Sequence, residues 1–248
     1  MSRLPRLELS QLPHLLTQHV APGERLFRDE LDAAALRGAL LEASRQHDVA
    51  VHAYVLHEEH FHLLATPAQA GALGLFMQSI GRRYVLGYNR RHGRHGGLWA
   101  GRFRATVIDP ARYLLEAMVF IELHAWRRGM SQSPCEVLTS VPSSLAHHLG
   151  QVPDPLVQDH AEFWATGNTP FEREASWRVR LEAGQGAKMV RCLAEAAHKG
   201  WALGDEDFLA RKQLQTARRL TPRPRGRPRK TAHQGIETLL VVDVSPIK

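Results

Sequence analysis

A short β-hairpin in the N-terminal half restricts the fold of this chain more than any other feature. Residues 49–56 are rich in residue types that favour strands, and residues 60–66 form a second such run that ends at Pro67. The polar tripeptide His-Glu-Glu at 57–59 separates the two runs and is typical of a turn. The pattern therefore predicts two antiparallel strands joined at residues 57–59.

The segments around this hairpin complete a β-α-β-β-α-β order. Apolar residues recur at helical spacing in 29–47 and 70–91, and residues 12–20 and 98–108 read as strands, the second with a kink at Gly101. This is the order of the ferredoxin-like arrangement, an antiparallel sheet with helices on one face. We therefore expect an α+β fold of this type.

A third helix should follow the last strand. Asp109 is suited to the N-cap and Pro110 to the first turn, while Gly129 is suited to ending the helix near Arg128. Beyond it the periodicity fades, helical pieces return after residue 170, and a basic low-complexity run begins at residue 221. The expected organisation is a folded domain at 1–130, an irregular and helical extension at 131–220, and a basic disordered tail at 221–248.

The charge balance points to a polyanionic partner. The 248 residues carry a net charge of +7, and the pI is near 9.9. Nucleic acid is the first expectation, with a basic surface that binds nothing as the alternative. No apolar run approaches the roughly 18 residues that span a membrane, so no membrane partner is expected. Two cysteines without a pairing pattern fit a reducing cytosol, which predicts a cytoplasmic protein.

Two histidines open the second strand of the hairpin. His60 and His62 are two residues apart, so a strand places both imidazoles on one face of the sheet. Two neighbouring imidazoles supply half of a metal site. With fifteen histidines in the chain, about one His-x-His would arise by chance, and two strand histidines without a metal remain the alternative.

Several segments in the right order resemble a known family. Residues 51–64 (VHAYVLHEEHFHLL) resemble the HUH segment of the single-tyrosine transposases, in particular the REP-associated tyrosine transposases of bacteria. Residues 76–84 (FMQSIGRRY) and 88–93 (YNRRHG) are similar to the family's long helix, and 98–105 (LWAGRFRA) to its "L-W-x-G-R-[FY]" strand. The resemblance is strong over residues 1–130 and patchy beyond.

This resemblance implies an HUH endonuclease type of fold and a defined chemistry. Members bind single-stranded DNA hairpins and cut beside them, with a divalent metal, Mg²⁺ or Mn²⁺, that polarises the scissile phosphate. A helix tyrosine attacks the phosphorus and becomes linked to the DNA end. The resemblance thus implies His60 and His62 as metal ligands, DNA as the partner, a nucleoid-associated bacterial location, and a possible homodimer.

The chain departs from the family where the nucleophile belongs. The family pattern is similar to "R-Y-I-x-L-N-P-V-R-A-G", and residues 119–129 read VFIELHAWRRG. Phe120 stands at the tyrosine position and has no hydroxyl with which to attack phosphorus. His124, one helical turn later, would face the metal as a third ligand. Tyr113 lies two turns earlier, about 10 Å along the helix axis, and is better explained as a packing residue.

Arginines in and after the second helix are the predicted DNA contacts, with interleaved aromatic residues that could stack on bases. A solvated basic face with core aromatics is the alternative. The tail is similar to an AT-hook, whose arginines would enter a narrow minor groove, although a plain basic tail is an equal possibility. The predicted contacts are Arg82, Arg83, Arg90, Arg91, Arg102 and Arg104, with Arg225, Arg227 and Arg229 in the tail.

Three functions follow from these patterns. The first is a transposase-family protein that binds single-stranded or hairpin DNA, with metal-assisted strand cleavage and transfer that is degenerate because of Phe120. The second is a non-catalytic DNA-binding protein or regulator derived from a transposase. The third is a metal-dependent nuclease that uses water, which would cleave DNA without forming an adduct.

Overall fold

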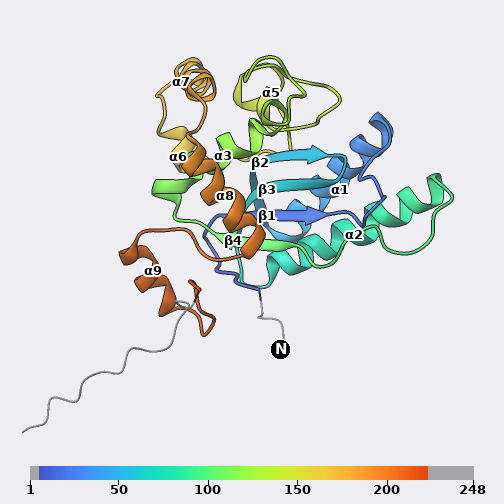
Figure 1. The fold of residues 1–248 in the computed structure, drawn as a ribbon, viewed down its shortest axis with the longest axis horizontal. Coiled ribbons are helices and arrows are strands. Elements are labelled where there is room, and N and C mark those ends of the chain that lie inside the picture. Colours follow the sequence, from blue (N-terminus) through green and yellow to red (C-terminus); the bar gives the residue numbers. More distant parts are fainter. Residues whose placement is uncertain (1–5, 223–248) are drawn as a thin grey trace, which may run out of the picture.

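Four antiparallel strands in the order β2-β3-β1-β4 form the central sheet (Figure 1). The structure is a computed structural model that describes residues 6–222. The strands are β1 (His14–His19), β2 (Val49–His57), β3 (His60–Pro67) and β4 (Arg104–Val107). This strand order is that of the ferredoxin-like arrangement, and the predicted α+β fold is confirmed.

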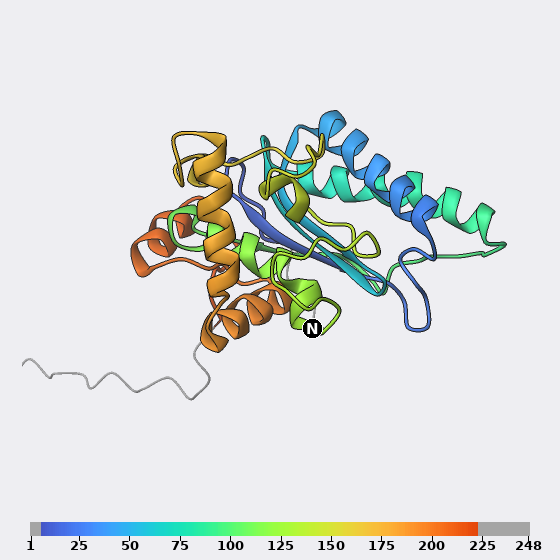
Figure 2. The same cartoon turned by 90° about the horizontal axis from the view of Figure 1, so that it is seen from above.

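The two faces of the sheet carry different layers (Figure 2). Helices α1 (Glu30–His47) and α2 (Ala72–Arg91) cover one face, where Phe61 and Leu63 of β3 join their core. Leu64 joins a second core with α3 (Pro110–Glu122) on the opposite face. Because side chains alternate along a strand, His60 and His62 share the α3 face with Leu64.

The fourth strand is shorter than the sequence predicts. Its regular ladder covers only Arg104–Val107, although residues 98–100 still pair with the end of β1. Ala100 N donates to His19 O at 3.0 Å, and Ala21 N donates to Leu98 O at 2.8 Å. Gly101 then adopts a φ of +139°, a conformation that residues with a side chain rarely adopt. This backbone conformation interrupts the hydrogen-bond ladder between β1 and β4. The kink was predicted correctly and the length was not.

The helix expected between Asp109 and Arg128 is divided in two. Helix α3 ends at Glu122, Leu123 forms the junction, and a short helix α4 (His124–Arg127) follows. Asp109 occupies the N-cap position, but its side chain makes no capping hydrogen bond. The division matters because His124 is the first residue of α4.

Residues after 130 pack onto the α3 face and beside β4. The backbone of Leu203 lies against the end of β4, where Leu203 N donates to Val107 O at 2.9 Å. Trp177 and Leu193 join the core of α3. The domain boundary at residue 130 stays a prediction. These helices are α5 (Leu145–His148), α6 (Ala161–Trp164), α7 (Pro170–Ala183), α8 (Ala187–Lys199) and α9 (Glu206–Gln213).

A buried carboxylate fixes the end of α3. Glu122 accepts hydrogen bonds from Ser144 Oγ at 2.5 Å and Trp177 Nε1 at 2.8 Å, and His148 Nδ1 lies 2.5 Å away. His148 Nε2 in turn faces Asp159 Oδ1 at 3.5 Å. These contacts tie α3 to α5 and α7 immediately before His124. Over residues 6–222, none of the helices combines the length and apolar character that crossing a membrane requires.

Candidate metal centre

Three strands present a row of imidazoles at one end of the sheet. Glu58 and Glu59 alone separate β2 from β3, so His57 and His60 are direct cross-strand partners. On the other side of β3, His19 of β1 is the partner of His60. Directly opposite residues share a face. The ring centroids are 5.0 Å apart for His57 and His60 and 5.1 Å apart for His19 and His60.

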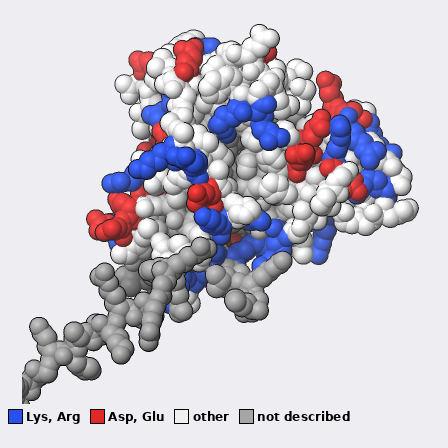
Figure 3. All heavy atoms as spheres, viewed as in Figure 1, with Lys and Arg blue, Asp and Glu red and all other residues white. Residues whose placement is uncertain are grey.

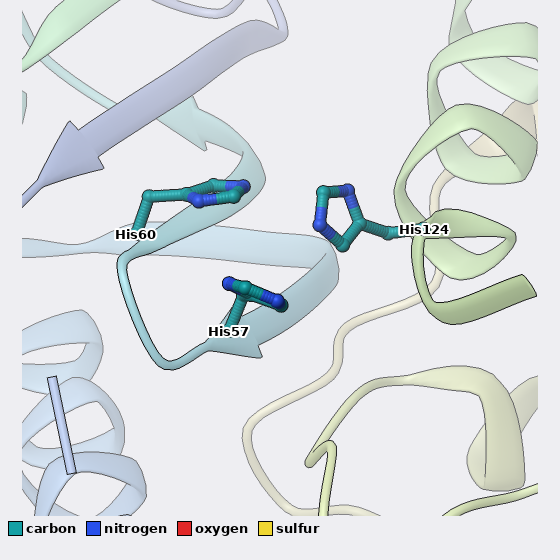
Figure 4. Close-up of side chains that lie close together, drawn as sticks. All are labelled: His57, His60 and His124. Atoms are coloured by element: carbon teal, nitrogen blue, oxygen red, sulfur yellow. The ribbon is translucent and has the colours of Figure 1, made fainter. Parts of the chain in front are cut away.

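His124 approaches this row from the α3 layer. Its ring centroid lies 4.9 Å from that of His60, 5.3 Å from that of His57 and 5.6 Å from that of His62. Figure 4 shows the rings of His57, His60 and His124 gathered in one place, two from the hairpin and one from the helix. One nitrogen of each of these three rings lies within 4.8 Å of the other two.

The residues present fit a divalent metal ion. Imidazole nitrogens bind such an ion at about 2.0–2.1 Å, which places two ligands on one ion about 3–4 Å apart. The three nitrogens lie within 4.8 Å of one another, so side-chain movements would be needed to bring them into that range. His124 Nε2 is buried and has no hydrogen-bond partner in residues 6–222. A buried polar atom without a partner is costly, and a metal ion would satisfy it.

The same burial keeps the imidazoles neutral. Burial lowers the pKa of His60 to about 3, and neighbouring histidines and an arginine add to the effect. Burial and nearby positive charge lower the pKa of His124 to about 3 as well. Burial holds the pKa of His62 well below its usual range. Neutral imidazoles carry the lone pairs that metal binding requires.

His62 and Phe120 pack together beside the cluster. The Nδ1 atom of His62 lies 2.8 Å from Thr17 Oγ1, and the two groups share a hydrogen bond. The ring centroids of His62 and Phe120 are 5.7 Å apart. The guanidinium carbon of Arg127 lies 4.5 Å from the centroid of Phe120, and Arg127 donates to the carbonyl oxygen of Phe120. The predicted tyrosine position is therefore a packed apolar ring next to the imidazoles.

The predicted DNA contacts on α2 lie in the layer on the opposite face of the sheet. Arg83 forms an ion pair with Glu42 of α1. Arg91 forms ion pairs with Asp29 at 2.6 Å and Asp32 at 2.5 Å. Figure 3 shows basic and acidic side chains intermixed at the right, where α1 and α2 lie. Arg82 and Arg90 are exposed and make no ion pair within residues 6–222.

Arg102 and Arg104 lie closer to the histidine row. Together with Thr17, His19 and His198 they line a hollow of about 310 Å³ at the edge of the sheet. Arg102 is exposed, and Arg104 donates to His198 O at 2.8 Å. The tail residues Arg225, Arg227 and Arg229 lie outside the described residues.

The aromatic residues between these arginines belong to the core. Tyr84, Tyr88 and Phe103 are buried, and Trp99 packs against Phe61 with ring centroids 6.0 Å apart. The Tyr88 hydroxyl donates to the carbonyl oxygen of Arg25 at 2.9 Å. The three buried rings are not free to stack on bases, so for Tyr84, Tyr88 and Phe103 the structure favours the alternative of core aromatics, whereas Trp99 is partly buried.

Two histidines of the row, His57 and His19, were not predicted from the sequence. His57 was assigned to the turn, but a two-residue turn makes the residues flanking it direct partners. Counting Glu58 and Glu59 alone as the turn would have paired His57 with His60. His19 was missed for a different reason, because its place beside His60 depends on the register between β1 and β3.

Comparison with known proteins identified distant structural likenesses. No protein-family description matches the chain, and no curated protein matches it. The structure of a REP-associated tyrosine transposase bound to a REP hairpin is 16% identical, with a TM-score of 0.48 over 65% of this chain and 96% of that one. A Deinococcus radiodurans protein described as a transposase is 17% identical, with a TM-score of 0.34 over 52% of this chain and 98% of that one.

Proposed function

We propose that this chain is a DNA-binding protein of the HUH transposase type, which grips single-stranded or hairpin DNA at a metal site and has lost the tyrosine nucleophile. The observation that carries the proposal is Phe120, packed against His62 beside a cluster of neutral imidazoles. The site retains ligands for a metal that would polarise a phosphate, and it lacks the hydroxyl that would attack one.

No other tyrosine is placed to substitute for Phe120. The chain has four tyrosines, and all of them lie in the described residues. Tyr54, Tyr84 and Tyr88 belong to the core on the opposite face of the sheet. Tyr113 lies seven residues before Phe120 on α3, about 10 Å along the helix axis.

The charges around the cluster support an anionic ligand. Arg127 contacts Phe120, and its Nη1 atom is buried without a partner in the described part of the chain. Burial lowers the pKa of Arg127 to about 10, which leaves it charged at neutral pH. A phosphate group would neutralise this cation. Arg102 and Arg104 add positive charge at the sheet edge, in a hollow that also contains His19, and could contact phosphates.

A labelled single-stranded DNA hairpin tests the proposal directly. The unmodified chain should bind the hairpin with Mg²⁺ or Mn²⁺ and give no covalent adduct on a denaturing gel. The variant Phe120→Tyr should form the adduct, because its phenol oxygen can bond to phosphorus while the sugar oxygen leaves and takes up a proton. An adduct with the unmodified chain would contradict the proposal.

The non-catalytic alternative shares a transposase ancestry with the first proposal, and both predict that the unmodified chain forms no adduct. A regulator derived from a transposase would bind the hairpin and leave it intact under every metal condition. Cleavage of the hairpin without adduct would instead indicate the water-dependent nuclease. Size measurement of the DNA-bound protein would test the possible homodimer, and the cytoplasmic, nucleoid-associated location stays a prediction.

A further inference from the structure

We propose that His148 and Asp159, with His147 as a weaker third ligand, form a second metal site for a transition-metal ion such as Zn²⁺. One ligand atom of each of these three residues lies within 4.8 Å of the other two. His147 and His148 end helix α5, and Asp159 lies in the segment that follows this helix. The site shares no residue with the histidine cluster of the β2–β3 hairpin, so it does not depend on the proposed function.

Two atoms of this group are buried and have no hydrogen-bond partner within residues 6–222. They are Nε2 of His148 and Oδ1 of Asp159. The two atoms lie 3.5 Å apart, and the side chain of His148 is completely buried. Two ligands of one Zn²⁺ ion, each about 2.0–2.2 Å from it, are separated by about 3–4 Å. The two atoms therefore already have the separation that a shared ion requires.

The other ring nitrogen of His148 has the kind of partner that metal-binding histidines usually have. His148 Nδ1 lies 2.5 Å from Glu122, whose carboxylate also accepts hydrogen bonds from Ser144 and Trp177. Because Glu122 is the acceptor for all three groups, Nδ1 of His148 carries a proton and donates it. A carboxylate on one nitrogen of a ring fixes the orientation of the ring and makes the other nitrogen a better metal ligand.

His147 is the weaker ligand because its second nitrogen already has a partner. Its Nε2 atom lies 3.5 Å from Asp159 Oδ1. Its Nδ1 atom accepts a hydrogen bond from the Asp154 N–H at 3.0 Å. A neutral ring that binds an ion through Nε2 carries its proton on Nδ1, so this hydrogen bond must open when the ion binds. We therefore expect His147 to contribute less to the affinity than His148 does.

A hollow beside the three residues leaves room for the remaining ligands of the ion. Its volume is about 240 Å³, and Gly150, Phe163 and Glu174 also line it. Water can complete the coordination from this side. Two imidazoles and one carboxylate suit Zn²⁺ or Co²⁺, whereas Mg²⁺ and Ca²⁺ prefer oxygen ligands alone. In the ion-free chain a proton on His148 Nε2 faces Asp159 instead, and a chelator keeps the chain in that state.

The position of the site gives the ion a structural role. Next to Asp159, the N–H of Gln158 donates to the carbonyl oxygen of Val51 on the edge strand β2 at 2.7 Å. His148 is held by Glu122 at the end of α3. An ion bound here would join α5 and the end of α3 to the segment beside β2. Saturating Zn²⁺ should therefore raise the midpoint of thermal unfolding.

Calorimetric titration with Zn²⁺ or Co²⁺ tests the site in a full-length chain that carries His60→Gln and His124→Gln, which disable the hairpin cluster. This background chain should still bind one ion. Adding Asp159→Asn should weaken binding by about 100-fold or more, because loss of a ligand costs at least as much as loss of an outer partner. Glu174→Gln is the matched control, because it removes a carboxylate from the same hollow but outside the group of three, and the affinity should be unchanged.

The two histidines should differ in the same titration. His148→Gln should weaken binding by about 100-fold or more, as Asp159→Asn does. His147→Gln should weaken it by about 10-fold, because this ring must give up a hydrogen bond in order to bind the ion.

A gain of signal guards against variants that simply fold poorly. Asp159→Cys replaces the carboxylate with a thiolate and should give the Co²⁺ complex a new thiolate-to-metal absorption band in the near ultraviolet. Glu174→Cys should give no such band, and the background chain, which already contains Cys135 and Cys192, provides the baseline.

Each result either supports the inference or overturns it. If the background chain binds neither Zn²⁺ nor Co²⁺, the inference is overturned, and the contact between His148 and Asp159 is an ion pair alone. Equal affinities of the Asp159→Asn and Glu174→Gln chains would place the ion elsewhere and overturn it too, as would a thiolate band from Glu174→Cys in place of Asp159→Cys. A failure of the hairpin cluster to bind metal would contradict the proposed function and leave these results unaffected.

Discussion

Thr17 forms a hydrogen bond that holds the ring of His62 in place beside the other histidines of the cluster. Its hydroxyl lies 2.8 Å from His62 Nδ1, and both side chains are buried. Thr17→Val keeps the shape of the side chain and removes the partner of that nitrogen. Leaving a buried polar atom unsatisfied costs about 1–3 kcal/mol, so the free energy of unfolding should fall by this amount in a urea titration.

Thr17→Ser is the matched control, because it keeps the hydroxyl and removes only a methyl group. Its free energy of unfolding should stay within about 1 kcal/mol of that of the unmodified chain. Equal stability of the valine variant and the parent would show that the Thr17–His62 hydrogen bond does not hold the ring in place.

For individual residues, the sequence predicts only those positions that follow from the local periodicity of a strand or helix. His60 and His62 were expected on one face because a strand alternates its side chains, and the structure places them there. The partners of Arg83 and Arg91 could not be predicted, because Glu42, Asp29 and Asp32 come from another helix and meet α2 only in the folded molecule. The hydrogen bond between Thr17 and His62 could not be predicted for the same reason, because the two residues lie on different strands.

At the scale of the elements, the packing of helix α3 against α5 depends on the charge of His148 in α5, which contacts Glu122 at the end of α3. Burial alone would lower the pKa of His148, but Glu122 and Asp159 outweigh it and raise the pKa to about 9. In the unfolded chain the pKa is about 6.5. The folded state therefore holds this proton more tightly, and its contribution is complete below pH 6.5 and is lost as the pH rises through about 9.

The free energy of unfolding should accordingly fall between pH 6.5 and 9, by up to about 3 kcal/mol. Denaturant titrations at several pH values measure this decline. His148→Gln is less stable throughout, because Glu122 loses a partner, but the decline attributable to this group should disappear. A parent chain whose stability is constant from pH 6.5 to 9 would refute the assignment of a charged His148.

The elements themselves were largely predictable, and their ends were not. The hairpin and the strand order follow from alternation and from the β-α-β-β-α-β sequence of patterns. The division of the third helix at Leu123 has no sequence signal, because neither glycine nor proline is present at the junction. The contacts of Glu122 with α5 and α7 fix the end of α3 there, and those contacts join segments more than twenty residues apart.

For the whole molecule, the net charge of +7 matters less than its distribution. The α2 arginines Arg83 and Arg91 are neutralised by acidic residues of α1 and its N-cap, on the opposite face from the histidines. Arg102 and Arg104 lie at the edge of the sheet, in a hollow that also contains His19. DNA bound at the histidine cluster would therefore contact Arg102 and Arg104, and would not contact Arg83 and Arg91.

This distribution makes a prediction about salt dependence. For single-stranded DNA, the logarithm of the binding constant falls linearly with the logarithm of the salt concentration, and each arginine that binds a phosphate contributes about 0.7 to the steepness of this line. The double variant Arg102→Gln, Arg104→Gln should therefore reduce the steepness by about 1.4. The control Arg83→Gln, Arg91→Gln removes the same charge, and it should lower stability while leaving the slope unchanged. Fluorescence anisotropy with a labelled hairpin at several salt concentrations measures both. If the control pair changes the slope and the sheet-edge pair does not, the DNA follows the α2 layer, and the histidine cluster is not where the strand is bound.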